Sequence, residues 1–261
     1  MTIALGILAK NGLVIAADSH ESRGIYKVDQ GKISAVLTAT TGAAEAHFRC
    51  CAISGSGDGH HIDAVTRQVM ECFSNGEAKS AKEVESDCAE TIRDFYLKHV
   101  APFGSYPEHE RPDFRLLLAA QLPGNRLLVT DKTVLKDASP YVAIGAGEIV
   151  AMPLLQRFYQ LPLPDVRSAI LLAAYVMYHV KETIEGCGKS TDISGIHKGN
   201  YFDLRRAETK ALEAAAGDYA AWVEPMMLRK LTSSDTEKQR GAASRAQRQL
   251  RRLIKAIKLP Q

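Results

Sequence analysis

The stretch TIALGILAKNGLVIAADS, residues 2–19, decides the fold. It contains two apolar, β-prone runs, residues 3–9 and 13–18, with Lys-Asn-Gly between them. Asn-Gly is the pair favoured in a two-residue type I′ turn, because both central residues of that turn have positive φ. The chain is therefore predicted to open with a β-hairpin. The hairpin brings Asp18, at the end of its second strand, beside Thr2 at the start of its first.

Thr2 directly follows the initiator methionine, and we expect a methionine aminopeptidase to remove Met1 because threonine is small. A threonine at the true N-terminus carries a hydroxyl and a free α-amine on one residue. An α-amino group has a pKa of about 7.7 to 8.0, so it can accept the hydroxyl proton near neutral pH. Many chains begin Met-Thr without consequence, so the residues around Thr2 decide whether it is a nucleophile.

Lys32 opens a third apolar run, KISAVLTA, which is predicted to begin at the same end of the sheet. A cation there would favour the neutral amine of Thr2 and polarise its hydroxyl, and Asp18 would compensate and orient that cation. Taken singly, Asp18 also suits a strand end, and Lys32 suits a strand edge that resists aggregation. The order of threonine, hairpin, aspartate and lysine is more specific than any of its parts.

This order resembles the proteasome β-subunit family of N-terminal-nucleophile hydrolases, with the likeness carried by TIALGILAKNGLVIAADSHESRG. The resemblance implies that Thr2 is the nucleophile, Asp18 its supporting acid and Lys32 the lysine beside it. Lys27 is the alternative lysine, because the interval between Asp18 and Lys32 is shorter than in that family. Two later segments, CGKSTDISGI and VAIGAGE, resemble the family more loosely.

The resemblance also implies an oxyanion hole and a substrate pocket. AISGSGDG, residues 52–59, resembles the family's glycine-rich loop, so Gly55 is expected to supply the amide that binds the oxyanion. Glu21, Ser34 and Ile53 match positions that line the substrate pocket in the family. No cofactor and no metal are expected.

Two positions depart from the family pattern. Ala146 stands where the family has a serine close to the threonine amine, and Ile184 stands where it has an aspartate. A catalytically weak or inactive ring subunit is therefore one alternative to an active hydrolase, and a small-amide hydrolase on the same fold is another.

The order of elements favours an α+β fold, because strands, two helices, strands, two helices and strands follow one another. That order predicts a four-layer αββα sandwich, the proteasome-like architecture of N-terminal-nucleophile (Ntn) hydrolases, over residues 1–203. Residues 204–261 are predicted to form a helical, basic C-terminal extension. The predicted helices are residues 62–73, 80–100, 147–159 and 165–185, with Asp58 as the cap of the first.

Composition narrows the class of protein. The longest apolar run, AILLAAYVMY, has ten residues against the roughly 20 that a membrane helix needs. Five cysteines and no signal-like N-terminus favour a reducing cytoplasm. A net charge of +3 is too small to indicate a nucleic-acid partner. His60 and His61 lack the spacing of metal ligands, so they do not indicate a metal site. GSGDG lacks the Lys-Ser/Thr ending of a phosphate-binding loop, so it does not indicate a nucleotide site.

The last helix is predicted to be amphipathic, with apolar residues on one face and arginines and lysines on the other. Such a face could bind a neighbouring subunit, an acidic surface, a lipid interface or nucleic acid, or be solvated while the apolar stripe packs on the protein. The complete prediction is a threonine-type peptidase that cleaves peptides or unfolded proteins within a homo-oligomeric ring in the cytoplasm.

Overall fold

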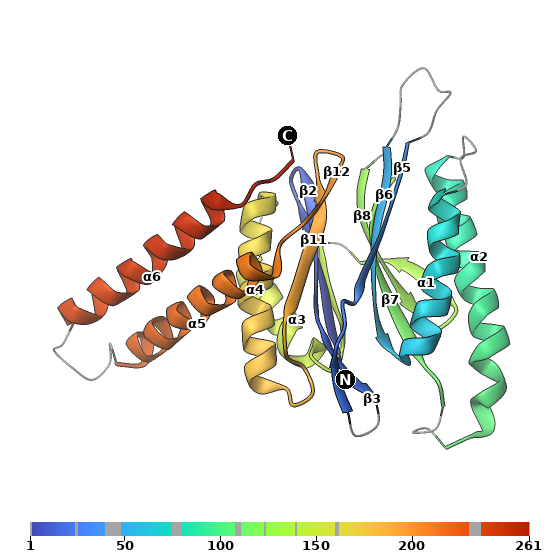
Figure 1. Cartoon of the computed structure of the whole chain (residues 1–261), viewed down its shortest axis with the longest axis horizontal. Helices are drawn as coiled ribbons and strands as arrows, with labels where there is room; N and C mark the ends of the chain where they lie inside the picture. Colours follow the sequence, from blue (N-terminus) through green and yellow to red (C-terminus); the bar gives the residue numbers. More distant parts are fainter. Residues whose placement is uncertain are drawn as a thin grey trace.

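The computed structural model describes residues 2–23, 26–39, 48–74, 80–107, 111–122, 124–138, 140–159, 162–229 and 236–260 (Figure 1). Within these residues the chain is mixed α+β, with two five-stranded antiparallel sheets and six α-helices. The mixed class and the two sheets agree with the prediction. None of the helices in this part of the chain combines the length and hydropathy needed to cross a membrane.

The first sheet has the strand order β10-β1-β2-β11-β12. Its core is the N-terminal hairpin, whose register pairs Ala4 with Ala17 and Ala9 with Gly12. β11 pairs with the far side of β2, placing Thr191 opposite Asp18. The strands are β1 (Ile3–Ala9), β2 (Gly12–Asp18), β10 (Tyr141–Gly145), β11 (Thr191–His197) and β12 (Asn200–Asp203).

The hairpin turn differs from the prediction. The loop is Lys10-Asn11, because Gly12 already pairs with Ala9, and neither loop residue is among the described residues with positive φ. The type I′ assignment was therefore wrong. Gly12 serves another purpose: a Cβ on it would lie 1.9 Å from the carbonyl oxygen of Ile196, so only glycine lets β11 approach this closely.

The second sheet has the order β5-β6-β7-β8-β9, and a two-stranded ribbon, β3-β4, joins the two sheets along the chain. The ribbon strands are β3 (His20–Arg23) and β4 (Tyr26–Asp29), and the sheet strands are β5 (Ile33–Ala39), β6 (Phe48–Gly57), β7 (Phe114–Leu122), β8 (Gly124–Asp131) and β9 (Val134–Asp137). Small and branched side chains from both sheets, among them Ala17, Ala52 and Leu117, form one buried cluster between them.

Helices cover the outer face of each sheet (Figure 1). α1 (Gly59–Ser74) and α2 (Ala81–His99) pack on the second sheet, and a 3-10 turn, Ala101–Ser105, follows α2. α3 (Glu148–Phe158) and α4 (Val166–Thr183) pack on the first. Asp58 caps α1 as predicted, its Oδ1 accepting the His61 backbone N–H at 3.0 Å.

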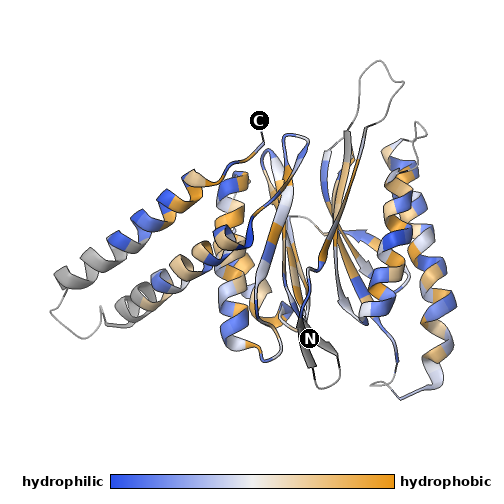
Figure 2. Cartoon of the chain, in the orientation of Figure 1, coloured by the Kyte–Doolittle hydropathy of each residue, from blue (hydrophilic) through white to orange (hydrophobic). Residues whose placement is uncertain are grey.

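α5 (Arg206–Arg229) and α6 (Thr236–Ala256) form a helical pair that extends away from the sheets beside α4 (Figure 1). Leu212 of α5 and Ile257, which directly follows α6, are buried in the core under α4. The four arginines Arg245, Arg248, Arg251 and Arg252 are exposed on α6, as predicted, while Leu250 is buried. Figure 2 shows that the described part of α6 contains both hydrophilic and hydrophobic residues.

Candidate active site

The start of β1 lies between the ends of its two neighbouring strands. Ile3 pairs with Gly145 at the end of β10, and Ala4 pairs with Ala17 near the end of β2. Gly145 has φ +100°, and a Cβ on it would lie 2.2 Å from the backbone oxygen of Thr2. Only glycine fits that conformation and that contact, so the backbone of Thr2 is held closely against β10.

Asp18 is fully buried and accepts three hydrogen bonds. Its Oδ1 accepts from the backbone N–H of Ile3 at 3.1 Å and from Lys32 Nζ at 3.0 Å. Its Oδ2 accepts from the backbone N–H of Gly188 at 3.1 Å. A carboxylate with 0% exposure is stable only when it is paired in this way. Asp18 therefore fixes both the first residue of β1 and the lysine.

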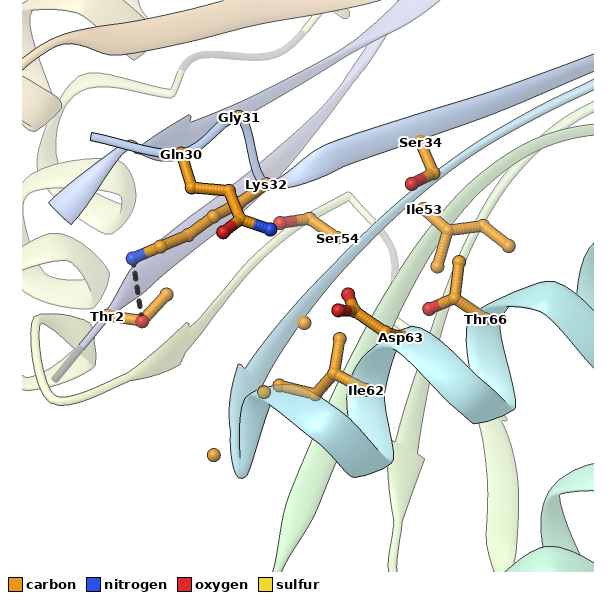
Figure 3. A pocket seen from close by; sticks show the side chains of 13 residues that line it. Thr2, Gln30, Gly31, Lys32, Ser34, Ile53, Ser54, Ile62, Asp63 and Thr66 are labelled. Atoms are coloured by element: carbon orange, nitrogen blue, oxygen red, sulfur yellow. Dashed lines mark hydrogen bonds between the residues drawn. The ribbon is translucent and has the colours of Figure 1, made fainter. Parts of the chain in front are cut away.

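Lys32 connects Asp18 to the hydroxyl of Thr2. Its Nζ donates to Thr2 Oγ1 at 2.8 Å (Figure 3). It also donates to Asp18 Oδ1 and to the backbone oxygen of His20. Three acceptor oxygens match the three N–H groups of an ammonium. The Thr2 oxygen thus accepts from Lys32, which leaves the hydroxyl proton free to be donated elsewhere.

The structure brings together Thr2, Asp18 and Lys32, the three residues predicted to form the site. The side chain of Lys27, the alternative lysine, lies outside the described side chains, as does that of Glu21. The backbone of Glu21 belongs to β3, where it pairs with Val28.

A pocket of about 140 Å³ opens beside Thr2 and Lys32 (Figure 3). Ser34 and Ile53, which were predicted to line the substrate pocket, and Gly55, which was predicted to supply the oxyanion-hole amide, all line this pocket. Ser34 comes from β5, Ile53 and Gly55 from β6, and the opposing wall comes from α1. The pocket therefore lies where Thr2 and residues 30–32 face β6 and the start of α1.

Gly55 occupies a part of β6 with one unpaired edge. Pairing between β5 and β6 stops at Ile33 and Ser54, whereas β6 continues to pair with β7 as far as Gly57. A Cβ on Gly55 would lie 2.5 Å from the side chain of Ile62, so glycine is needed for α1 to pack this closely. The backbone of Gly55 is thereby left open to the pocket.

The two departures from the family pattern directly follow β10 and α4. Ala146 is exposed in the turn after β10. Ile184 ends α4, where its backbone N–H donates to the oxygen of Val180. Ser56 has its hydroxyl against Gly145, since a Cβ on that glycine would lie 2.7 Å from Ser56 Oγ. Ser56 thus adds a hydroxyl near the end of β10 from the second sheet.

Sequence reasoning missed several residues of the site. The Gly188 amide precedes β11, and the pairing of β11 with β2 that brings it to Asp18 carries no local sequence signal. Asp63 and Thr66 line the pocket from α1, and Gln30 lines it from the segment before β5. The three-residue spacing of Asp63 and Thr66 places them on one helix face, which is the signal that could have found them. In the described part of the chain no group of three or more His, Cys, Asp or Glu side chains could hold a metal ion.

No protein-family model matches the sequence, and no curated protein matches it either. Solved structures of Anbu proteins resemble it. The Anbu complex of Pseudomonas aeruginosa, described as a helical assembly, has a TM-score of 0.70 at 17% identity, over 90% of this chain and 99% of that chain. Anbu from Yersinia bercovieri, described as an ancestral β-subunit, has a TM-score of 0.67 at 15% identity over the same shares.

The Gly-1 mutant of Anbu from Hyphomicrobium sp. strain MC1 has a TM-score of 0.63 at 16% identity and covers 100% of both chains. That match extends through residues 204–261. At these identities the likeness shows a shared fold, and this fold is proteasome-like.

Proposed function

We propose that this chain is an N-terminal threonine hydrolase that cleaves peptide or amide bonds. The contact that supports this most directly is the 2.8 Å hydrogen bond from Lys32 Nζ to Thr2 Oγ1, with Asp18 behind the lysine. In this proposal the fold is the four-layer αββα sandwich of the Ntn class, and residues 204–261 are an extension of it. Its five free, buried cysteines suit the reducing cytoplasm that we propose as its location.

The first chemical step begins after Met1 is removed. The Thr2 oxygen attacks the carbonyl carbon, and the α-amine of Thr2 takes the hydroxyl proton, directly or through a water. Lys32 keeps its proton and stabilises the negative charge that develops on the Thr2 oxygen. The Gly55 amide donates to the carbonyl oxyanion, a contribution of about 3 to 4 kcal/mol per donor in hydrolases.

The second half of the reaction releases the products. The C–N bond breaks as the leaving amine takes the proton from the α-ammonium, leaving an ester on Thr2. Water then attacks the ester, and its proton returns to the threonine oxygen.

A labelling experiment tests the nucleophile. A peptide epoxyketone, which reacts with N-terminal threonines, should add its mass to the N-terminal peptide of the wild-type protein. Thr2→Ala should abolish labelling without unfolding the protein, because Thr2 precedes β1 and is only half-buried. Intact mass should show that Met1 is absent. Persistent labelling of the alanine variant, or retention of Met1, would reject the proposal.

A ring subunit without activity is the second candidate, favoured by Ala146 and Ile184 at positions where the resemblance implies polar groups. It predicts a folded protein with Met1 removed that takes no label and hydrolyses no peptide.

We also propose that the chain forms a homo-oligomeric ring. The helical assembly described for the Pseudomonas aeruginosa Anbu complex, together with the shared fold, supports association of several copies, and the closed ring is our proposal. Sedimentation should show an oligomer at micromolar concentration, and deletion of residues 232–261 should weaken it while each subunit stays folded. A monodisperse full-length monomer would reject the ring.

A further inference from the structure

The wall of the pocket opposite Thr2 carries a carboxylate that the catalytic proposal does not use. Asp63 lies on α1 and lines the pocket together with Thr2 and Lys32 (Figure 3). Its side chain is exposed, and no hydrogen bond or ion pair joins it to another described residue. Asp63 is the fifth residue of α1, beyond the first turn where an acid gains most from the helix dipole. None of these interactions therefore gives the Asp63 carboxylate a role in stabilising the described part of the fold.

The charge balance of the pocket leaves Asp63 uncompensated. Lys32 and Asp63 are the charged side chains among the described residues that line it. The charge of Lys32 is already matched by Asp18, whose Oδ1 lies 3.0 Å from its Nζ. With the Thr2 α-amine neutral, as its proposed role as base requires, a single negative charge therefore remains facing the pocket, and it favours a cation over a neutral or acidic group.

The remaining lining suits a long basic side chain. Ile53 and Ile62 provide apolar surface, while Ser34 and Thr66 provide hydroxyls nearby (Figure 3). Lysine and arginine place a hydrocarbon stem along apolar surface and keep their charged end on a polar partner. Aspartate and glutamate would meet the carboxylate of Asp63 with like charge.

We infer that the pocket selects substrates with a basic side chain on the acyl side of the scissile bond, with Asp63 as the carboxylate that binds it. This inference rests on the proposed hydrolase function. It makes Asp63 a specificity residue: the carboxylate contacts the substrate side chain and takes no part in the chemistry at Thr2.

The test compares peptide epoxyketones that are identical except for the residue next to the reactive group, which is arginine or its neutral isostere citrulline. The wild-type protein should be labelled about tenfold faster by the arginine compound. This factor corresponds to the lower end of the free-energy range for a hydrogen bond to a charged group. The difference should shrink as salt is raised. Asp63→Asn should remove the preference by slowing the arginine reaction much more than the citrulline reaction.

Glu71→Gln is the matched control, because Glu71 is an exposed acid of the same helix that does not line the pocket. It should keep the preference. Asp63→Ser provides a second neutral variant if the asparagine variant does not fold.

The outcomes separate the two proposals. If neither compound labels wild-type Thr2, the hydrolase proposal fails and the inference fails with it. If both label Thr2 at equal rates, the hydrolase proposal stands and the specificity inference is overturned. Equal slowing of both compounds by Asp63→Asn and Asp63→Ser would also overturn it, because the residue would then be structural.

Discussion

At the open end of the β1–β2 hairpin, beside Thr2, Asp18 and Lys32 each have specific partners, whereas along α6 the exposed arginines lie in solvent. Asp18 accepts from Lys32 and from two backbone amides, and Lys32 has three acceptors. In the described part of the chain no hydrogen bond joins the exposed guanidiniums of Arg245, Arg248, Arg251 and Arg252 to another residue. Substitution should therefore be costly and specific at the first place and mild at the second.

The largest effect is expected from Lys32→Ala. It leaves Asp18 buried without its cation, which should lower the free energy of unfolding by about 3 to 5 kcal/mol. Hydrolysis should fall roughly a hundredfold or more in the variant that remains folded, because the Thr2 oxygen loses its charged donor. Denaturant unfolding and peptidase assays measure the two losses. Lys27→Ala serves as the comparison, and a greater loss there would show that Lys27 is the functional lysine.

A smaller effect is expected from Gly145→Ala at the same end of the sheet. The positive φ and the backbone oxygen of Thr2 both oppose a Cβ, so the free energy of unfolding should fall by about 1 to 3 kcal/mol. Gly104→Ala is the control, since a Cβ at Gly104 meets nothing within 4 Å. Equal melting temperatures for the two variants would contradict the close contact between β10 and Thr2.

Asp58 lies between the two extremes, because it is partly exposed but caps α1. Burial raises its pKa, yet the hydrogen bonds from His61 outweigh burial and lower that pKa below its usual value. A carboxyl whose pKa is lowered in the folded state stabilises the protein at pH values above its unfolded-state pKa. That stabilisation is lost as the pH falls through the folded-state pKa. Asp58→Ala should cost about 1 kcal/mol at pH 7 and almost nothing near pH 2, as measured by urea unfolding. A cost independent of pH would mean that the carboxylate charge is unimportant.

The smallest effect is expected from the double variant Arg248→Gln, Arg252→Gln on α6. Both side chains are solvated, so the free energy of unfolding should change by less than about 0.5 kcal/mol. Leu250→Ala, which truncates a buried side chain of the same helix, should cost more. A large loss in the arginine variant would show that the α6 charges are paired in an assembly.

The difference between the two regions also explains what the sequence could predict. The hairpin follows from alternating apolar runs and a turn, and it necessarily places Asp18 beside Thr2. Lys32 follows from the start of the next apolar run. The Gly188 amide could not be predicted, because its contact depends on which strand pairs with β2. The ribbon His20–Arg23 and Tyr26–Asp29 was missed because HESR has no apolar alternation.

For α6, the helical spacing predicts that one face is buried but not what covers it. The burial of Ile257, which directly follows α6, against the core under α4 depends on where the chain before α6 places this helix. Asp63 was missed for a related reason: its spacing indicates a helix face, but the sheet opposite that face is set by long-range pairing. Local patterns thus predict the elements, and the contacts between distant strands complete the site.

The hydrogen bond from Gly188 to Asp18 joins residues 170 positions apart in the chain. During synthesis from the N-terminus, the hairpin and Lys32 emerge early, but this donor reaches Asp18 only after β11 has been made and has paired with β2. A nascent or truncated chain therefore lacks a complete carboxylate site beside its threonine. The timing of folding delays assembly of the reactive end of the molecule until most of the chain is in place.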